Sequence, residues 1–131
     1  MSDKPIKVPG PDHPITVTPY ADRVVATVNG RTIADSTATL ALQEANYPVV
    51  HYFPRSDVDL TALEPTDHAT YCPYKGDASY FTIRLGDVVL PNAVWSYEHP
   101  YAPVAEIGEY VAFYPDRVEV TAGARDPSPA G

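Results

Sequence analysis

The sequence predicts a mainly β domain of short antiparallel strands with one short helix. Runs of β-branched and aromatic residues recur along the chain between turn residues, which is typical of short strands. The 131 residues include 15 prolines, about twice the ~5% that is usual. Because proline donates no hydrogen bond to a helix or a sheet, so many prolines keep regular elements short.

The clearest local signal in the N-terminal half is the dipeptide Asn29-Gly30 between two β-branched runs. Both residues tolerate positive φ, which a type I′ turn requires, so we predict a hairpin over residues 23–35. Residues 15–18 alternate with period two and predict a strand. In residues 39–44 the leucines alternate as in a strand, whereas the alanines, glutamine and glutamate favour a helix. We interpret this segment as a strand.

Five more short strands are predicted, over residues 49–53, 69–72, 78–85, 88–90 and 93–98. In residues 78–85 the odd positions, which include Phe81 and Ile83, form the expected apolar face. The even positions, which include Tyr80, form a mixed face.

The last part of the domain is predicted to contain the helix and a second hairpin. Pro103 suits the first position of a helix, so residues 104–109 are expected to form one or two helical turns. Residues 111–114 and 117–121 flank the turn at Pro115-Asp116 and are predicted to pair with each other.

Length and composition indicate a single domain with two less ordered ends. We expect residues 1–11 to be a flexible arm, residues 12–122 to be the domain and residues 123–131 to be a disordered tail. No apolar run approaches the ~20 residues of a membrane span, and the start of the sequence lacks a signal-peptide core. The expected location is therefore cytoplasmic.

Charge and cysteine content argue against several partners. A net charge of −8 works against a polyanion, and the three lysines form no basic stripe. We therefore expect neither nucleic acid nor a membrane as partner. Cys72 is the only cysteine and the four histidines show no paired spacing, so neither a metal nor another cofactor is expected.

Four blocks of sequence resemble, in this order, the domain of unknown function 427 (DUF427) family. They are Glu44–Val58 (EANYP running into YFPRSDV), Thr70–Gly76 (TYCPYKG), Ala78–Tyr80 (ASY), and Ala93–Glu98 (AVWSYE) followed by Val111–Pro115 (VAFYP). The resemblance as a whole is taken to cover about residues 23 to 122. The resemblance implies a β-tent (Mss4-like) fold, similar to methionine sulfoxide reductase B, the ligand-binding domain of cereblon and the RIG-I C-terminal domain.

The resemblance leaves the activity open. Many β-tent proteins bind zinc through four cysteines, but this chain has one, so neither the zinc nor reductase chemistry carries over. The activity of the DUF427 family is unknown, although the family is sometimes labelled a nucleotidyltransferase domain.

Aromatic residues are concentrated in the middle of the chain, where 13 of the 14 lie between Tyr47 and Tyr114. Tyrosine outnumbers phenylalanine ten to three, and each buried phenol needs a hydrogen-bond partner. This composition favours an aromatic-lined cleft, and a tyrosine-rich β surface is the alternative.

We predict a ligand-binding site at this cleft, formed by Tyr52, Arg55, Asp57, Cys72, Lys75, Tyr80, Trp95, Tyr97 and Glu98. The aromatic rings would stack on the ligand, and Lys75 and Arg55 would contact its charged groups. Each residue also has a structural alternative. Trp95 packs in the core, Lys75 is solvated or buried in an ion pair, and Arg55 pairs with a carboxylate.

The leading functional hypothesis is a binding module for a small polar or planar ligand. The first alternative is an enzyme, either a nucleotidyltransferase in which Asp57 and Asp59 hold Mg²⁺ or a thiol enzyme that uses Cys72. The Gly-Ser turn expected before such an aspartate pair is missing. The second alternative is a protein-interaction adaptor, which needs no deep pocket.

One cysteine and no paired histidines predict a fold that is independent of zinc. Protein purified without an affinity tag is expected to contain well under one equivalent of zinc by elemental analysis. A stoichiometric zinc whose removal unfolds the protein would contradict this prediction.

Overall fold

The Asn29-Gly30 turn closes the first hairpin of the fold, as the sequence predicts. In the computed structural model, which describes residues 5–123, Asn29 and Gly30 have φ values of 50° and 81°, the positive values that a type I′ turn requires. The turn joins β2 (Val24–Val28) to β3 (Arg31–Ser36), and β10 (Glu119–Ala122) pairs with the other edge of β2. These antiparallel strands form one sheet, in the order β10-β2-β3.

A second three-stranded sheet contains the segment in which helix and strand propensities compete. β4 (Thr39–Glu44) lies between β1 (Ile15–Tyr20) and β5 (Val50–Tyr52), with antiparallel pairing on both sides. The strand prediction for residues 39–44 is confirmed. Pairing with two neighbours and the burial of Leu42 outweigh the helix propensity of this segment.

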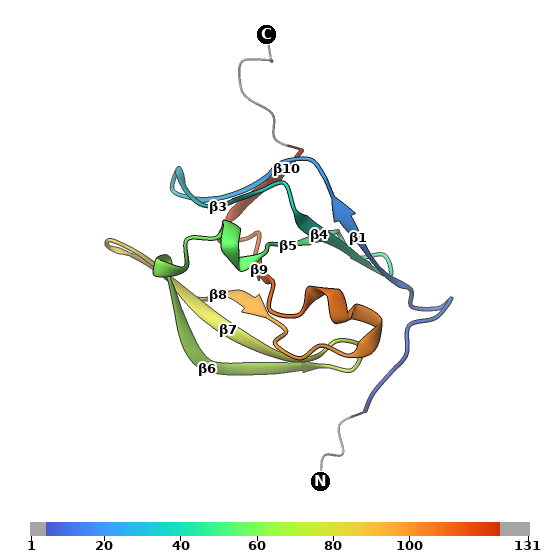
Figure 1. Ribbon diagram of the computed structural model, residues 1–131. Helices are drawn as coiled ribbons and strands as arrows, with labels where there is room; N and C mark the ends of the chain where they lie inside the picture. Colours follow the sequence, from blue (N-terminus) through green and yellow to red (C-terminus); the bar gives the residue numbers. More distant parts are fainter. Residues whose placement is uncertain (1–4, 124–131) are drawn as a thin grey trace.

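The largest sheet has four antiparallel strands in the order β6-β7-β8-β9. They are β6 (Leu63–Cys72), β7 (Gly76–Leu85), β8 (Val88–Ser96) and β9 (Val111–Phe113). β6 begins before the strand predicted at 69–72, and the strands predicted at 88–90 and 93–98 are one continuous strand. Figure 1 shows β6, β7 and β8 of this sheet below β1, β3, β4 and β10 of the other two sheets. The short strands β5 and β9 lie between these two levels. The predicted mainly β class is confirmed.

Two β-bulges lie at the same level of the large sheet, one on each side of β7. Residues 66–68 of β6 interrupt its pairing with β7, and the register of β8 against β7 shifts between Phe81 and Ile83. Bulges leave the extra residues unpaired and bend the strand that contains them. The apolar face predicted for β7 is confirmed at Phe81, Ile83 and Leu85, which pack in one hydrophobic cluster, while Ala78 and Tyr80 of the opposite face are buried in another.

The hairpin predicted over residues 111–121 does not form, because its two strands belong to different sheets. β9 pairs with β8, whereas β10 pairs with β2. The turn itself is present, since the backbone N–H groups of Arg117 and Val118 both donate to the carbonyl of Tyr114 at 3.0 Å. Val118 follows this turn and is buried in the core, where the chain passes from the large sheet to the β10-β2-β3 sheet.

Between residues 5 and 123, helical structure is limited to short 3₁₀ segments. They are η1 (Arg55–Asp57), η2 (Leu60–Ala62) and η3 (Ala102–Ile107). η3 lies close to the predicted helix, has proline in its first turn and buries Val104 and Ile107. Among residues 5–123, no helix has the length and apolarity that crossing a membrane would require.

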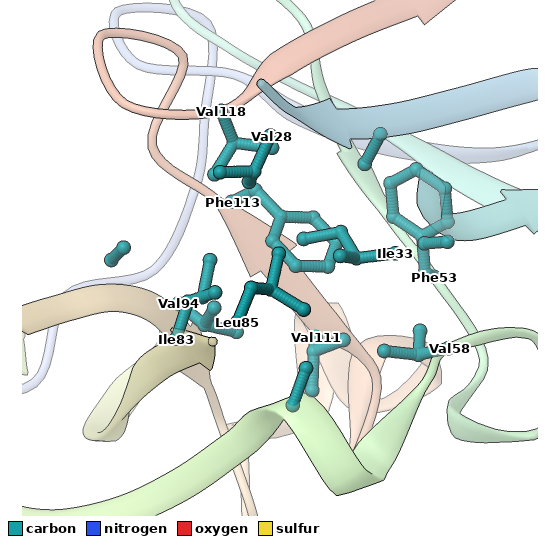
Figure 2. Close-up of a cluster of buried hydrophobic side chains, with 14 of the residues drawn as sticks. Val28, Ile33, Phe53, Val58, Ile83, Leu85, Val94, Val111, Phe113 and Val118 are labelled. Atoms are coloured by element: carbon teal, nitrogen blue, oxygen red, sulfur yellow. The ribbon is translucent and has the colours of Figure 1, made fainter. Parts of the chain in front are cut away.

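Two clusters of buried side chains hold the three sheets together. In the larger cluster, Val28 and Ile33 of the first sheet face Ile83 and Val94 of the large sheet (Figure 2). Phe53 and Phe113 meet between them edge to face, with ring centroids 5.3 Å apart. The smaller cluster lies between the β1-β4-β5 sheet, the large sheet and η3.

The fully buried position of Ile83 yields a stability prediction. Ile83→Ala is expected to lower the free energy of unfolding by about 2–5 kcal/mol, because it removes buried methyl groups and leaves a cavity. Val89→Ala on the neighbouring strand is the control, since Val89 is 43% exposed and should lose less than about 0.5 kcal/mol. Urea-unfolding midpoints measure both changes, and equal losses would contradict this description of the core.

Candidate functional site

Trp95 is held at the end of β8 by aromatic contacts on two sides. Its indole N–H donates to the hydroxyl oxygen of Tyr52 at 3.1 Å, and the two rings meet edge to face. The ring of Tyr114 lies 4.5 Å away at an angle of 49°. Tyr52 is 1% exposed, and this burial raises the pKa of its phenol. The hydroxyl therefore stays protonated and fixes the indole without introducing a charge.

Trp95 and Tyr114 form a wall of a cavity of about 610 Å³, which we name the aromatic pocket. Its lining residues are Tyr47, Pro48, Val49, Val50, His51, Trp95, Phe113, Tyr114, Pro115, Val120 and Ala122. None of them is Asp, Glu, Lys or Arg, and most are apolar. This size and composition are typical of sites for small organic molecules.

His51 is the most polar group of the aromatic pocket. Its Nδ1 lies 3.1 Å from the hydroxyl of Thr39, and Tyr20 contacts its ring edge to face. Burial lowers the pKa of His51, so the ring is neutral near pH 7. Its Nε2 has no hydrogen-bond partner among residues 5–123. The pocket therefore offers a ligand one uncharged hydrogen-bonding nitrogen.

A second hollow of about 360 Å³, which we name the polar pocket, adjoins the aromatic pocket. Its lining residues are His68, Tyr80, Pro91, Asn92, Tyr114, Asp116 and Arg117. Tyr114 lines both pockets. Its hydroxyl lies 3.3 Å from that of Tyr80, which in turn lies 2.8 Å from the hydroxyl of Thr70. Burial and the hydrogen bond with Tyr80 raise the pKa of Tyr114 to about 12, so the shared wall is uncharged near pH 7.

Lys75 is half-buried and takes part in a network of charges. Its side chain is 13% exposed, and its Nζ donates to one carboxylate oxygen of Glu44 at 2.7 Å. The other oxygen of Glu44 lies 2.7 Å from Nε2 of His13. The ammonium also lies 5.7 Å from the centre of the Tyr97 ring. Burial raises the pKa of Glu44, but the hydrogen bonds from Lys75 and His13 outweigh it, so the net effect is a lowered pKa.

The described part of the N-terminal arm lies against the turn that carries Lys75. The ring of His13 stacks on Tyr74 at 4.1 Å, and the backbone N–H of Lys7 donates to the carbonyl of Pro73 at 3.0 Å. The hydroxyl of Tyr71 donates to the carbonyl of Pro5. Flexibility of the arm remains a prediction, but these contacts link it to the domain.

Arg55 is also paired within the protein. Its Nη2 donates to Glu98 at 2.6 Å and to the hydroxyl of Ser96 at 3.1 Å, and its guanidinium lies over the ring of Phe81. The expected pairing of Arg55 with a nearby carboxylate is observed. Nε of Arg55 is buried without a hydrogen-bond partner.

The two aspartates that follow Arg55 are engaged locally. Asp57 accepts a hydrogen bond from the hydroxyl of Ser36 at 2.7 Å, and Asp59 caps η2 through the backbone N–H of Thr61. No group of three or more potential metal ligands occurs within the part of the chain that the structure describes.

The structure brings most of the predicted site residues close together, but they take part in different interactions. Tyr52, Cys72, Tyr80, Trp95 and Tyr97 all pack in the smaller buried cluster. Trp95 lines the aromatic pocket and Tyr80 the polar pocket, whereas Lys75 and Arg55 line neither. The participation of these nine residues in ligand binding remains a prediction.

Sequence reasoning missed several pocket residues. Tyr47, Phe113 and Tyr114 fall within the sequence blocks that resemble DUF427, and His51 lies between two parts of one block, so the blocks carried a signal for them. Asn92 and Arg117 fall outside every block, and nothing local in the sequence marks them.

Comparison with protein families matches residues 16–123 to the family described as "Domain of unknown function (DUF427)". The chain belongs to the DUF427 family. A search of curated proteins finds no match. The DUF427 family match covers all three sheets except the first residue of β1, so both pockets lie within the part that defines the family.

The burial of the Lys75–Glu44 pair yields a prediction with a matched control. Lys75→Met is expected to cost about 1–3 kcal/mol of stability at pH 7, because it leaves the largely desolvated Glu44 carboxylate with His13 as its remaining partner. Arg84→Met breaks an exposed pair with Glu64, in which the two side chains are 56% and 54% exposed, and should cost less than about 1 kcal/mol. Urea unfolding measures both.

The stability difference between the wild type and Lys75→Met is expected to depend on pH in a defined direction. Because the pKa of folded Glu44 lies below its ordinary value of 4.5, the stabilisation by its charged form is present above that pH. It is lost as the pH falls through the folded pKa. The stability gap between the wild type and Lys75→Met should therefore narrow below about pH 4.5. A gap that is independent of pH, or a Lys75→Met loss as small as that of Arg84→Met, would contradict a buried ion pair.

Proposed function

We propose that this DUF427 protein is a binding module for a small planar ligand, which it holds in the aromatic pocket beside Trp95. The observation that supports this most directly is the wall of two large rings, Trp95 and Tyr114, at the side of an uncharged cavity of about 610 Å³. Aromatic walls favour flat, polarisable ligands, since rings attract one another in offset and edge-to-face arrangements. His51 adds one polar contact that can orient the ligand.

The wall is preorganised, and this supports binding with little loss of entropy. Trp95 is fixed by its hydrogen bond to Tyr52, and Tyr52 is itself fully packed in the smaller cluster. Rotamers already fixed before binding do not have to be ordered by the ligand.

Observed contacts favour this proposal over the two alternatives. Asp57 and Asp59 are engaged with Ser36 and Thr61, so no observation supports their joint use in nucleotidyl transfer. Cys72 has no side-chain hydrogen bond among residues 5–123 that would activate its thiol. An adaptor surface needs no deep cavity, whereas the aromatic pocket is large enough to enclose much of a small molecule.

The single tryptophan provides a direct test. Titration with 2-naphthamide, a neutral bicyclic probe, is expected to shift the one indole N–H signal in a ¹H–¹⁵N NMR spectrum in a saturable way. Val120→Phe should weaken binding at least ~tenfold, since the larger ring occupies part of the pocket and removes contact area from the probe.

The exposed substitution Val89→Phe serves as the control, because Val89 lies outside the aromatic pocket. The affinities of the two variants are compared only after thermal melting shows that both are folded. If the indole signal of the wild type stays unchanged up to the highest probe concentration, the proposal fails.

A further inference from the structure

We infer that the ligand is an aromatic carboxylate, whose ring lies in the aromatic pocket and whose carboxylate is bound by Arg117 and Asn92 in the polar pocket. This inference rests on the proposed function and extends it to a second subsite. The two pockets share Tyr114 as a wall. A ligand that reaches both would extend along the Tyr114 ring.

The polar pocket is built by the paired bulges of the large sheet. His68 belongs to the bulged segment of β6, and Pro91 and Asn92 belong to that of β8. The hydroxyl of Thr66 connects the two segments across β7 by its 2.7 Å hydrogen bond to Oδ1 of Asn92. Bulges occur preferentially next to functional sites, where they redirect side chains that a regular strand would point elsewhere.

Asn92 is positioned to donate a hydrogen bond into this pocket. The Thr66 hydroxyl accepts from the backbone N–H of His68 at 3.2 Å. Its own hydrogen has two possible acceptors, and Oδ1 of Asn92 at 2.7 Å is much closer than the carbonyl of Tyr80 at 3.5 Å. This orients the amide, and its NH₂ group has no hydrogen-bond partner among residues 5–123. Asn92 also has a φ of 51° within the bulged segment of β8, a left-handed conformation that asparagine tolerates better than most residues.

Arg117 supplies the positive charge. Four other cationic side chains are paired with carboxylates, namely Arg23, Arg55, Lys75 and Arg84. No carboxylate of residues 5–123 lies within salt-bridge distance of Arg117, which donates only to the backbone carbonyl of Pro91. This contact anchors the guanidinium to the residue that directly precedes Asn92, and both side chains line the polar pocket.

The charge balance of the polar pocket favours a monoanion. Asp116 lines the pocket together with Arg117, so the pocket is lined by one cationic and one anionic side chain. A carboxylate can accept hydrogen bonds from both the guanidinium and the Asn92 amide. A dianionic phosphate would meet one guanidinium and the repulsion of Asp116.

A matched pair of probes tests the carboxylate directly. The probes 2-naphthoate and 2-naphthamide share a ring and differ in charge, and isothermal titration calorimetry gives the affinity of each. Wild-type protein is expected to bind the naphthoate at least ~tenfold more tightly, as for a charge-assisted hydrogen bond. Arg117→Gln should abolish this preference and leave the affinity for 2-naphthamide unchanged.

Arg31→Gln is the control, since it changes the net charge equally and Arg31 is exposed outside both pockets. Asn92→Gly, which keeps the positive φ accessible, should reduce the preference without unfolding the protein, as judged by thermal melting. If neither probe binds, the proposed function itself fails. If both bind equally to the wild type, or if Arg31→Gln abolishes the preference as fully as Arg117→Gln, only the carboxylate subsite is refuted.

Discussion

The backbone bridge between Phe53 and Val111 joins two of the three sheets, and much of the remaining architecture depends on it. Each residue donates its N–H to the carbonyl of the other, at 2.7 and 3.0 Å. The bridge sets the end of β5 against the start of β9, and both side chains are fully buried. Phe53 then meets Phe113 in the larger cluster, while the preceding residue, Tyr52, reaches Trp95 on the other side of the junction. One junction thus organises both the core and the wall of the aromatic pocket.

The distribution of charge follows from the scarcity of cations in an acidic chain. Lys75 and Arg55 are occupied by Glu44 and Glu98, in pairs that connect segments far apart in sequence. Both pairs are partly shielded from water, so loss of one partner would leave the other charge incompletely solvated. Arg117, in contrast, lies at the mouth of a hollow with no carboxylate paired to it among the described residues. This contrast moves the candidate charge contact from the Lys75 turn to the turn after β9.

The bulges of the large sheet connect its construction with its proposed use. They present His68 and Asn92 from strands on opposite sides of β7 to the same hollow. On β7 itself both faces are buried, since Phe81 and Ile83 pack in the larger cluster while Tyr80 packs in the smaller one and reaches Tyr114. Irregular strand pairing therefore generates the polar pocket, while regular pairing supplies the rigid frame around it.

The sequence by itself determined the features that depend on a few neighbouring residues. The Asn29-Gly30 turn follows from the tolerance of both residues for positive φ, and the β class follows from β-branched runs between prolines. The resemblance to the DUF427 family could also be predicted from the sequence, because each of its blocks is a continuous run of residues. Tertiary structure decided whether β9 pairs with β10 or with β8, that the second face of β7 is buried as well, and where Lys75 finds its partner 31 residues away. Each of these choices depends on contacts between distant segments, and local propensity carries no information about which distant edge, bulge or carboxylate will be within reach.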